Sequence, residues 1–186
     1  LILAGLVTPR PIALTTTVDP EGRVNAAPFS FFNVLGDSPP IVGFCPGDRS
    51  AGVPKDTARN IRLTHEFGGN RGDEASREQM NLCAATLPPG ENELVHAGLT
   101  ALPSTAVKPP RIAEAPASLE CKSHSIIEIG DNRLIIGEVL RVHVREGVFD
   151  PETWLVQPGN YRPIGRMQSP NWYCYTREMF EMKRPK

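Results

Sequence analysis

The chain of 186 residues carries 20 Lys and Arg residues against 21 Asp and Glu residues, and 40% of its residues are hydrophobic. The length suffices for one well-packed domain and the charge is balanced, so we expect a single domain over residues 1–186 that does not bind nucleic acid. No apolar run approaches the roughly 20 residues of a membrane helix, so we expect a soluble protein with no membrane partner.

The four cysteines, Cys45, Cys83, Cys121 and Cys174, are widely spaced along the sequence. No Cys-x-x-Cys pair suggests zinc or a redox dithiol, and isolated cysteines usually pack as small hydrophobic residues. The sequence also lacks the His-Glu-x-x-His, Gly-x-Ser-x-Gly and Gly-x-Gly-x-x-Gly motifs, so we predict no metal site and no catalytic triad. Without a recognisable secretory signal, we expect the reducing cytoplasm.

The first predicted elements form a β-hairpin. Residues 12–18 are rich in β-branched side chains, an Asp-Pro-Glu-Gly sequence favours a turn, and residues 24–27 supply the second strand. An aromatic cluster follows at residues 28–33. After a proline-rich turn at residues 37–40, residues 41–45 are predicted to form a short apolar strand that is buried on both faces.

A helix of two to three turns is predicted directly after Pro54, with Asp56 or Thr57 capping its first turn. Lys55, Asp56 and Thr57 combine a cation, a hydroxyl group and free backbone N–H groups at the positive end of a helix dipole. Such an arrangement binds phosphate. The alternative, which this segment alone favours, is a plain capped helix on a solvated surface.

The middle of the chain is first rich in glycine and then rich in proline. Residues 68–79 are polar, and a second helix is predicted over residues 74–85. Residues 86–117 form a proline-rich segment with a short helix at residues 91–97. A long segment of this kind is either a functional loop or an arm that wraps a neighbouring subunit.

Two long strands joined by a Gly-Asp-Asn turn are predicted towards the C-terminus. Residues 118–129 have mainly apolar or small odd positions and mainly charged even positions, including Glu120, so we expect a half-buried strand of period two. The partner strand, residues 134–144, carries four aliphatic side chains on one face: Ile136, Leu140, Val142 and Val144.

A final strand is predicted over residues 172–176. Strands outnumber helices along the chain, and neighbouring strands are joined by tight turns. This pattern favours a mainly β protein with an antiparallel sheet closed into a small barrel over a parallel α/β arrangement.

The aromatic cluster allows two interpretations. The rings of Phe29, Phe31 and Phe32 taken alone are more typical of a hydrophobic core. The hydroxyl, amide and backbone groups between Ser30 and Asn33 would also suit a flat heterocycle with a hydrogen-bonding edge.

Four segments follow one another in a fixed order: PRPIALTTTVDPEGRVNAAPFSFFNVLGDSPPIVGF, PKDTARNIRLTHEF, LECKSHSIIEIGDNRLIIGEVLRVHV, and YRPIGRM with NWY. In this order they resemble the flavin reductase-like family with the FMN-binding split barrel, including its flavoredoxin-type members. The resemblance covers nearly the whole chain, and the first third is its most specific part. It implies a six-stranded antiparallel Greek-key split β-barrel with a few peripheral helices, non-covalently bound FMN, and a homodimer.

The resemblance also implies cofactor-binding residues at matching positions. Those matched to the isoalloxazine edge and part of the ribityl chain are Pro28, Ser30, Phe31, Phe32 and Asn33. Those matched to the phosphate-binding helix start are Lys55, Asp56 and Thr57, with Arg59 as a second cation. Arg10 and Thr15 match positions near the flavin, and Arg166 is a weaker candidate for a position near the ring or the dimer partner.

One stretch departs from the family pattern. The family usually has an apolar strand after the position of Phe67, whereas residues 68–72 here read Gly-Gly-Asn-Arg-Gly. Polar, flexible residues either weaken a barrel strand or place it at the edge of the sheet.

The leading hypothesis is an FMN-dependent oxidoreductase of the flavin reductase type, in which NADH or NADPH passes a hydride to FMN. Because the cofactor carries this chemistry, we predict no catalytic side chain. A monooxygenase or another redox protein is the expected acceptor. The alternatives are a flavoredoxin-like electron carrier without NAD(P)H activity and a cofactor-free split-barrel binding module.

Overall fold

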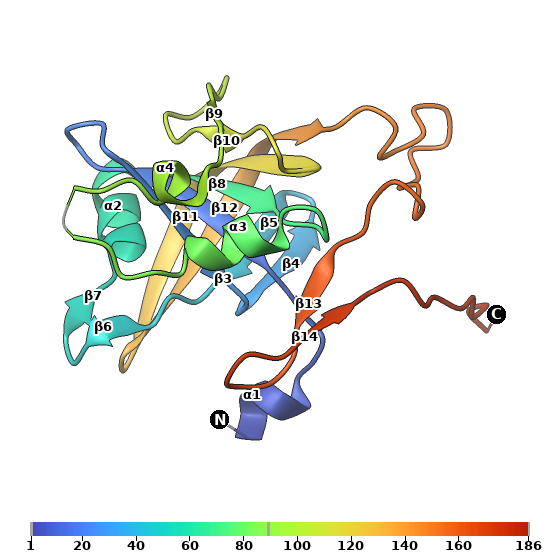
Figure 1. The fold of residues 1–186 in the computed structure, drawn as a ribbon, viewed down its shortest axis with the longest axis horizontal. Coiled ribbons are helices and arrows are strands. Elements are labelled where there is room, and N and C mark those ends of the chain that lie inside the picture. Colours follow the sequence, from blue (N-terminus) through green and yellow to red (C-terminus); the bar gives the residue numbers. More distant parts are fainter. Residues whose placement is uncertain (1, 89, 186) are drawn as a thin grey trace.

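The computed structural model describes residues 2–88 and 90–185. Positions 1, 89 and 186 of the predicted single domain, including position 89 of its proline-rich segment, lie outside the described residues. The main feature is an antiparallel sheet of seven strands in the order β3-β2-β8-β11-β12-β5-β4 (Figure 1). Its strands are β2 (Ala13–Val18), β3 (Val24–Phe29), β4 (Phe32–Asp37), β5 (Pro40–Phe44), β8 (Glu66–Arg71), β11 (Ala117–Ile129) and β12 (Asn132–Val144).

Shorter elements surround this sheet. Small antiparallel sheets are formed by β1 (Arg10–Pro11), β13 (Ile164–Arg166) and β14 (Tyr173–Tyr175), by β9 (Ala101–Leu102) and β10 (Arg111–Ile112), and by β6 (Asp48–Ser50) and β7 (Val53–Pro54). The helices of the described residues are α1 (Ile2–Leu6), α2 (Asp56–Thr64), α3 (Arg77–Leu82) and α4 (Glu93–Ala97). None of these helices is long and apolar enough to cross a membrane.

The large sheet curls back on itself. Strands β3 and β4 stand at opposite ends of the strand order, yet only Ser30 and Phe31 separate them in the chain. A backbone hydrogen bond of 2.9 Å from Cys45 N–H to the Phe31 carbonyl ties the end of β5 to this connection. The mainly β, split-barrel fold is therefore confirmed, with seven strands in the sheet. Strand β4 is an addition to the predicted elements.

The inside of the barrel is lined by a cluster contributed by every strand of the sheet and by α2. Phe44 lies 5.3 Å from Phe29 on one side and 5.3 Å from Phe67 on the other, measured between ring centroids. Phe32 is also buried in this cluster, whereas Phe31 is 53% exposed. The aromatic segment thus divides, with Phe29 and Phe32 in the core and Phe31 at the surface.

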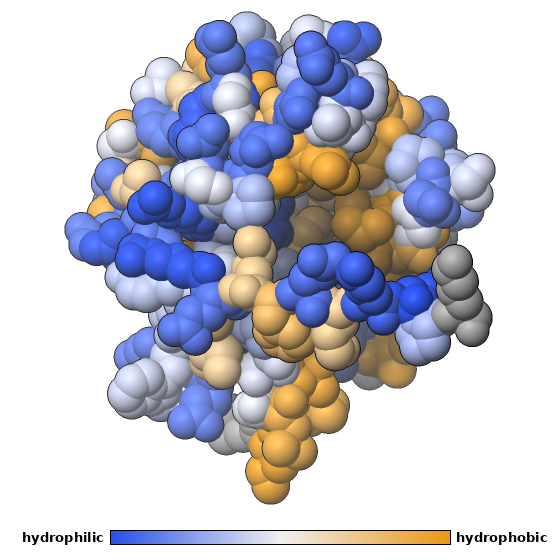
Figure 2. All heavy atoms as spheres, turned by 90° about the vertical axis from the view of Figure 1, so that its right-hand side faces the viewer, coloured by the Kyte–Doolittle hydropathy of each residue, from blue (hydrophilic) through white to orange (hydrophobic). Residues whose placement is uncertain are grey.

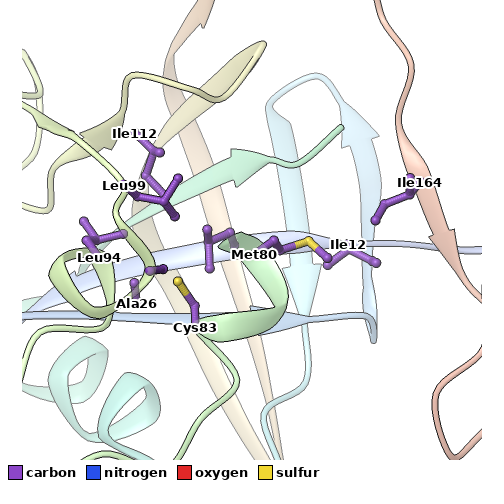
Figure 3. Packing of buried hydrophobic residues seen from close by; sticks show 10 residues of the cluster. Ile12, Ala26, Met80, Cys83, Leu94, Leu99, Ile112 and Ile164 are labelled. Carbon is purple, nitrogen blue, oxygen red and sulfur yellow. The ribbon is translucent and has the colours of Figure 1, made fainter. Parts of the chain in front are cut away.

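A second hydrophobic cluster covers the outer face of β2 and β3. Met80 of α3, the adjoining C-cap residue Cys83 and Leu94 of α4 pack there against Ala26, as Figure 3 shows. Leu99 and Ile112 from the proline-rich segment join the same cluster. A large part of residues 86–117 therefore packs on the chain's own barrel, and we call residues 99–112 the strap.

Both predicted helices of this region form, but they are shorter than predicted. The second helix begins only at Arg77, because the Asp73 carboxylate accepts hydrogen bonds from the Ala75 and Ser76 amides and holds a turn there. Helix α4 begins after Asn92, whose side chain accepts from the Leu94 amide at 2.9 Å, and it ends at a left-handed Gly98.

Strand β8 lies in the middle of the sheet, between β2 and β11, so the edge position considered for its polar sequence is wrong. A side chain at Gly68 would overlap the Thr16 hydroxyl, which donates to the Pro110 carbonyl at 2.7 Å. The buried Asn70 donates to the Leu14 carbonyl and accepts from the Ser118 hydroxyl at 2.8 Å. Gly68 therefore suits a crowded position inside the barrel, and the side chain of Asn70 is buried with its hydrogen bonds made.

The long hairpin of β11 and β12 is confirmed, but its predicted alternation is wrong in part. A β-bulge between Glu120 and Cys121 breaks the period of two, and both residues are fully buried. On β12 the side chain of Ile135 is buried, whereas Leu140 and Val142 are 45% and 55% exposed. The aliphatic face of β12 therefore points partly towards solvent.

The buried Glu120 carboxylate fastens the strap to the barrel. It accepts hydrogen bonds from the backbone N–H groups of Thr105 (3.0 Å) and Ala106 (2.5 Å), and it lies 2.5 Å from His143 Nε2. Burial opposes ionisation of this carboxyl, but these hydrogen bonds and His143 hold its pKa below the ordinary value of 4.5.

Glu120→Gln is expected to lower the free energy of unfolding by about 1.5–3 kcal/mol at pH 7, because charge-assisted hydrogen bonds are lost. A carboxyl group whose pKa is lowered by folding stabilises the fold at every pH above its ordinary pKa. This contribution disappears as the pH falls through the pKa of the folded state. The gap between wild type and variant should therefore close below pH 4.5. Thermal unfolding of both proteins between pH 7 and pH 3 measures this difference in stability. Glu66→Gln, which alters the exposed contact to the Lys108 amide, is the control. A gap independent of pH would contradict this account.

Candidate functional site

A cleft of about 700 Å³ lies beside the edge of the sheet at β3. Its walls are β3, the start of α2, and the loop between α3 and α4. Strand β3 ends the strand order, so one of its edges is not paired with another strand of the sheet. Five of the predicted cofactor-binding residues line this cleft: Pro28, Lys55, Asp56, Thr57 and Arg59.

Helix α2 presents its uncapped N-terminus to the cleft. The N-cap residue is Lys55, with φ −64° and ψ 155°, and no side chain caps the helix, so the predicted capping by Asp56 or Thr57 is wrong. The first intrahelical hydrogen bond runs from Arg59 N–H to the Lys55 carbonyl at 3.0 Å. The N–H groups of Asp56, Thr57 and Ala58 come before this bond and have no acceptor within the helix. Free N–H groups at the start of a helix attract anions.

Three cations surround this helix start. Asp56 pairs with Arg49 at 2.5 Å and with Arg59 at 3.1 Å, so two guanidinium groups share one carboxylate. The Lys55 ammonium lies 5.5 Å from the centre of the Phe29 ring and forms no ion pair with any described residue. The helix start is thus positive overall, and Lys55 is available to an anionic ligand.

The floor of the cleft is a network of short polar side chains between β2, β3 and α2. Asn25 donates to the Thr57 hydroxyl at 3.0 Å and to the Thr17 hydroxyl at 3.2 Å. Asn60 donates to the same Thr17 hydroxyl at 3.1 Å. Asn25 and Asn60 were missed in the sequence. Asn60 could have been found from its spacing, because a residue three positions after Thr57 lies on the same face of the helix.

Glu93 and Cys83 close the opposite wall. The Glu93 carboxylate accepts a hydrogen bond of 2.9 Å from the Ala26 amide, which lies on the unpaired edge of β3. Burial and the Glu93 charge raise the pKa of the Cys83 thiol to about 12. The thiol is therefore protonated at neutral pH, and the cleft offers no thiolate nucleophile.

The other six predicted site residues do not line the cleft: Arg10, Thr15, Ser30, Phe31, Phe32 and Asn33. Thr15 is buried on β2, one strand from the cleft, and its hydroxyl finds no hydrogen-bond partner among the described residues. Ser30 and Phe31 directly follow the cleft wall formed by Pro28 and Phe29. Asn33 is exposed and accepts a hydrogen bond from the Val34 amide at 2.9 Å.

Arg10 links the segment after α1 to the end of β13. Its guanidinium donates to the Val7 carbonyl at 2.9 Å and to the Met167 carbonyl at 2.7 Å, and it lies 5.5 Å from the Phe31 ring. Burial and the nearby Arg166 lower the pKa of Arg10. Arg166 is opposite Arg10 in the register of β1 and β13, but its guanidinium lies 4.6 Å from the centre of the Tyr173 ring and donates to the Pro170 carbonyl at 2.5 Å.

Residues 2–88 and 90–185 contain no group of three His, Cys, Asp or Glu residues placed to hold a metal ion. Within the same residues, Cys45, Cys83, Cys121 and Cys174 are free thiols. Cys83 and Cys121 are buried, as expected for cysteines that pack as small hydrophobic residues, whereas Cys45 and Cys174 are only half-buried.

Comparison with known proteins gives consistent results. Residues 5–165 match the family described as the flavin reductase like domain. An uncharacterized protein of Halalkalibacterium halodurans is 40% identical over 190 residues, which cover 99% of this chain and 90% of the relative.

Two solved structures are similar over almost the entire chain. The first is nitrilotriacetate monooxygenase component B from Bacillus cereus, with a TM-score of 0.92 and 34% identity over 97% of this chain and 91% of that chain. The second is 2-nitrobenzoate 2-nitroreductase from Pseudomonas fluorescens, with a TM-score of 0.87 and 36% identity over 99% of this chain and 89% of that chain.

Proposed function

The chain belongs to the flavin reductase-like family, and from this premise we propose that it is an FMN-dependent oxidoreductase that uses NADH or NADPH. The observation that carries the proposal is the cleft beside β3, into which α2 directs an uncapped N-terminus flanked by Lys55. A cleft of about 700 Å³ is within the range of roughly 300–1,000 Å³ usual for small-molecule sites.

The residues of the cleft fit the phosphate end of FMN. The amides at the start of α2, the Lys55 ammonium and the Thr57 hydroxyl would donate to the phosphate oxygens, as the resemblance implies. Arg59 would add charge from the rim, while Asp56 would hold Arg49 and Arg59 in place through its two ion pairs.

The residues at the end of β3 fit the flat end of the ligand. Pro28 lines the cleft, Ser30 and Phe31 form the connection from β3 to β4, and Asn33 is the second residue of β4. The exposed Phe31 ring, with Arg10 beside it, offers a surface for a flat ring. Phe32 would act from the core by supporting this connection, and Thr15 would support the neighbouring strand.

Bound FMN would supply the redox chemistry by accepting a hydride from NADH or NADPH. Because the cofactor would supply this chemistry, the proposal assigns no general base to the chain. Its own residues would bind the phosphate, orient the ring and shield it from water.

The decisive measurement is the absorbance of the protein with FMN before and after addition of NADH or NADPH under nitrogen. We expect bleaching of the flavin bands with at least one of the two nucleotides. Bleaching by neither would contradict the reductase and leave the flavoredoxin-like carrier. A protein that takes up no FMN at all would contradict both flavin functions and favour a cofactor-free binding module.

We further propose that two copies of the chain assemble and that reduced flavin serves a monooxygenase or another redox protein. Apolar side chains gather in a recess on the face shown in Figure 2, which carries the segments that follow β12. These segments expose Trp154, Trp172 and Phe180. Contiguous exposed apolar side chains often mark protein interfaces.

The homodimer predicts a sedimenting mass of about twice 20.4 kDa at micromolar concentration with FMN present. The physical reason is that exposing apolar side chains such as Trp154 and Trp172 to water is unfavourable. Sedimentation equilibrium measures the mass directly. A monomer under these conditions would contradict the dimer without affecting the assignment of the cleft.

A further inference from the structure

A groove of about 540 Å³ lies between α3 and β14 and shares no lining residue with the cleft beside β3. Its wall on α3 includes Leu82, and its wall on the other side is formed by Ile164 of β13 and by the whole of β14, Tyr173–Tyr175. Leu82 and Tyr175 are about half exposed. The groove therefore presents leucine and tyrosine side chains to water, which is typical of a surface that binds another molecule.

The groove also offers backbone hydrogen-bonding groups. Strand β14 ends the order β1-β13-β14, so its edge facing away from β13 is unpaired within this sheet. Neighbouring residues of a strand point to opposite faces, yet all three residues of β14 line the groove, which indicates that the groove runs along this edge. An unpaired strand edge beside apolar side chains suits an extended peptide segment.

The chain itself carries such a segment directly after β14. Residues 176–185, which we call the tail, contain no helix or strand. Arg177 Nε donates to the Glu74 carboxylate at 2.6 Å, and beyond this anchor the tail runs away from the barrel (Figure 1). Phe180 and Met182 are 84% and 80% exposed, and no residue of the tail lines the groove. An apolar segment and an apolar groove thus occur in one chain without touching each other.

The sequence of the tail matches the groove in an extended conformation. Alternate residues of an extended segment point to the same side, so Phe180 and Met182 would enter the groove together while Met179 faces away. The cations Lys183 and Arg184 follow at once, and the groove carries Glu78, whose carboxylate is largely exposed although it pairs with Arg77. Both the apolar anchors and the charges are therefore complementary.

We propose that the tail of one copy binds in the groove between α3 and β14 of a second copy, with Phe180 and Met182 as its anchors. By two-fold symmetry the second copy returns the same contact, so the anchors of both copies leave water. This inference rests on the proposed homodimer and names the contact that holds it together. The groove and the cleft share no residue, so FMN binding does not depend on this contact.

Phe180→Ala should raise the dissociation constant of the dimer about 100-fold, because the loss of an anchoring aromatic side chain costs roughly 10-fold at each of two symmetric contacts. Met179→Ala is the matched control, since Met179 is also exposed but would face away from the groove, and it should change the constant by less than about 3-fold. Sedimentation equilibrium over a range of concentrations measures both. Equal effects of the two substitutions would overturn the proposal.

A disulfide places the tail directly. The double variant Leu82→Cys, Phe180→Cys is oxidised with diamide, which takes up two electrons and two protons from a pair of thiols. We expect a disulfide-linked dimer of about twice 20.4 kDa on a non-reducing gel. The matched pair Leu82→Cys, Met179→Cys should give much less of it, and the wild type shows the background from the native thiols.

A disulfide within one copy would show that the tail folds into its own groove and would overturn the proposal. The absence of any link in a variant that sediments as a dimer would overturn it as well, while leaving the homodimer intact. A wild-type protein that sediments as a monomer would overturn the homodimer and this contact together. Uptake of FMN is measured separately by absorbance, so a failure of the flavin function is distinguished from a failure of the tail contact.

Discussion

Replacing both Lys55 and Thr57 by alanine is expected to weaken FMN binding by about 2–4 kcal/mol, or roughly 30- to 700-fold in the dissociation constant. Each residue would lose a charge-assisted hydrogen bond to the phosphate worth about 1.5–3 kcal/mol. The two losses are not fully additive, because both groups would contact the same phosphate. Fluorescence titration of the apo protein with FMN measures the effect.

Two controls make this result specific to the phosphate. Riboflavin, which lacks the phosphate, should lose much less affinity in the same double variant. Leu63→Ala changes an exposed residue of α2 outside the cleft and should leave FMN binding unchanged. Unchanged FMN affinity in the double variant would place the phosphate elsewhere than at the start of α2.

Gly68→Ala is expected to destabilise the fold by about 1–3 kcal/mol. The added methyl group would overlap the Thr16 hydroxyl and come within 3.3 Å of the Pro110 carbonyl oxygen. If Thr16 rotates away, its buried hydroxyl loses the hydrogen bond to Pro110. The expected fall in Tm is about 2–4 °C for each kcal/mol, which thermal unfolding at pH 7 would detect.

The neighbouring Gly69 provides the matched control. A methyl group there would lie 3.7 Å from the Leu119 side chain, an ordinary contact. Because alanine also reduces the freedom of the unfolded chain, Gly69→Ala should be neutral or slightly stabilising. Equal destabilisation by the two substitutions would contradict the contact with Thr16 as the source of the cost.

Local patterns in the sequence were enough to predict much of the fold. The β-branched run before the Asp-Pro-Glu-Gly turn predicts β2 and β3, and Pro54 followed by Lys55 places the start of α2 to within a residue. These elements depend on turn chemistry and on the backbone preferences of neighbouring residues, which the sequence displays directly. The same holds for the long hairpin of β11 and β12, whose turn and strands are both local.

The burial of individual side chains could not be predicted in this way. Glu120 has the spacing of a solvent-facing residue, yet a bulge turns it inward, where the strap supplies its hydrogen bonds from fifteen residues away. The glycine-rich residues 68–72 suggested either a weakened strand or an edge strand, yet β8 is central in the sheet. At Gly68 the contacts of Thr16 and the strap leave room only for glycine, which no local pattern reveals.

In the candidate site, too, some features follow from the local sequence and others only from the tertiary structure. By itself, the sequence determined the start of α2 with Lys55 and Thr57, since a helix start and its charges are local features. Only the tertiary structure decided that β3 is an edge, that this edge and α2 line one cleft, and that Asn25 and Asn60 both donate to the Thr17 hydroxyl. The physical reason is that hydrogen bonding within a helix or turn acts over a few residues, whereas burial and pairing depend on segments brought together from distant parts of the chain.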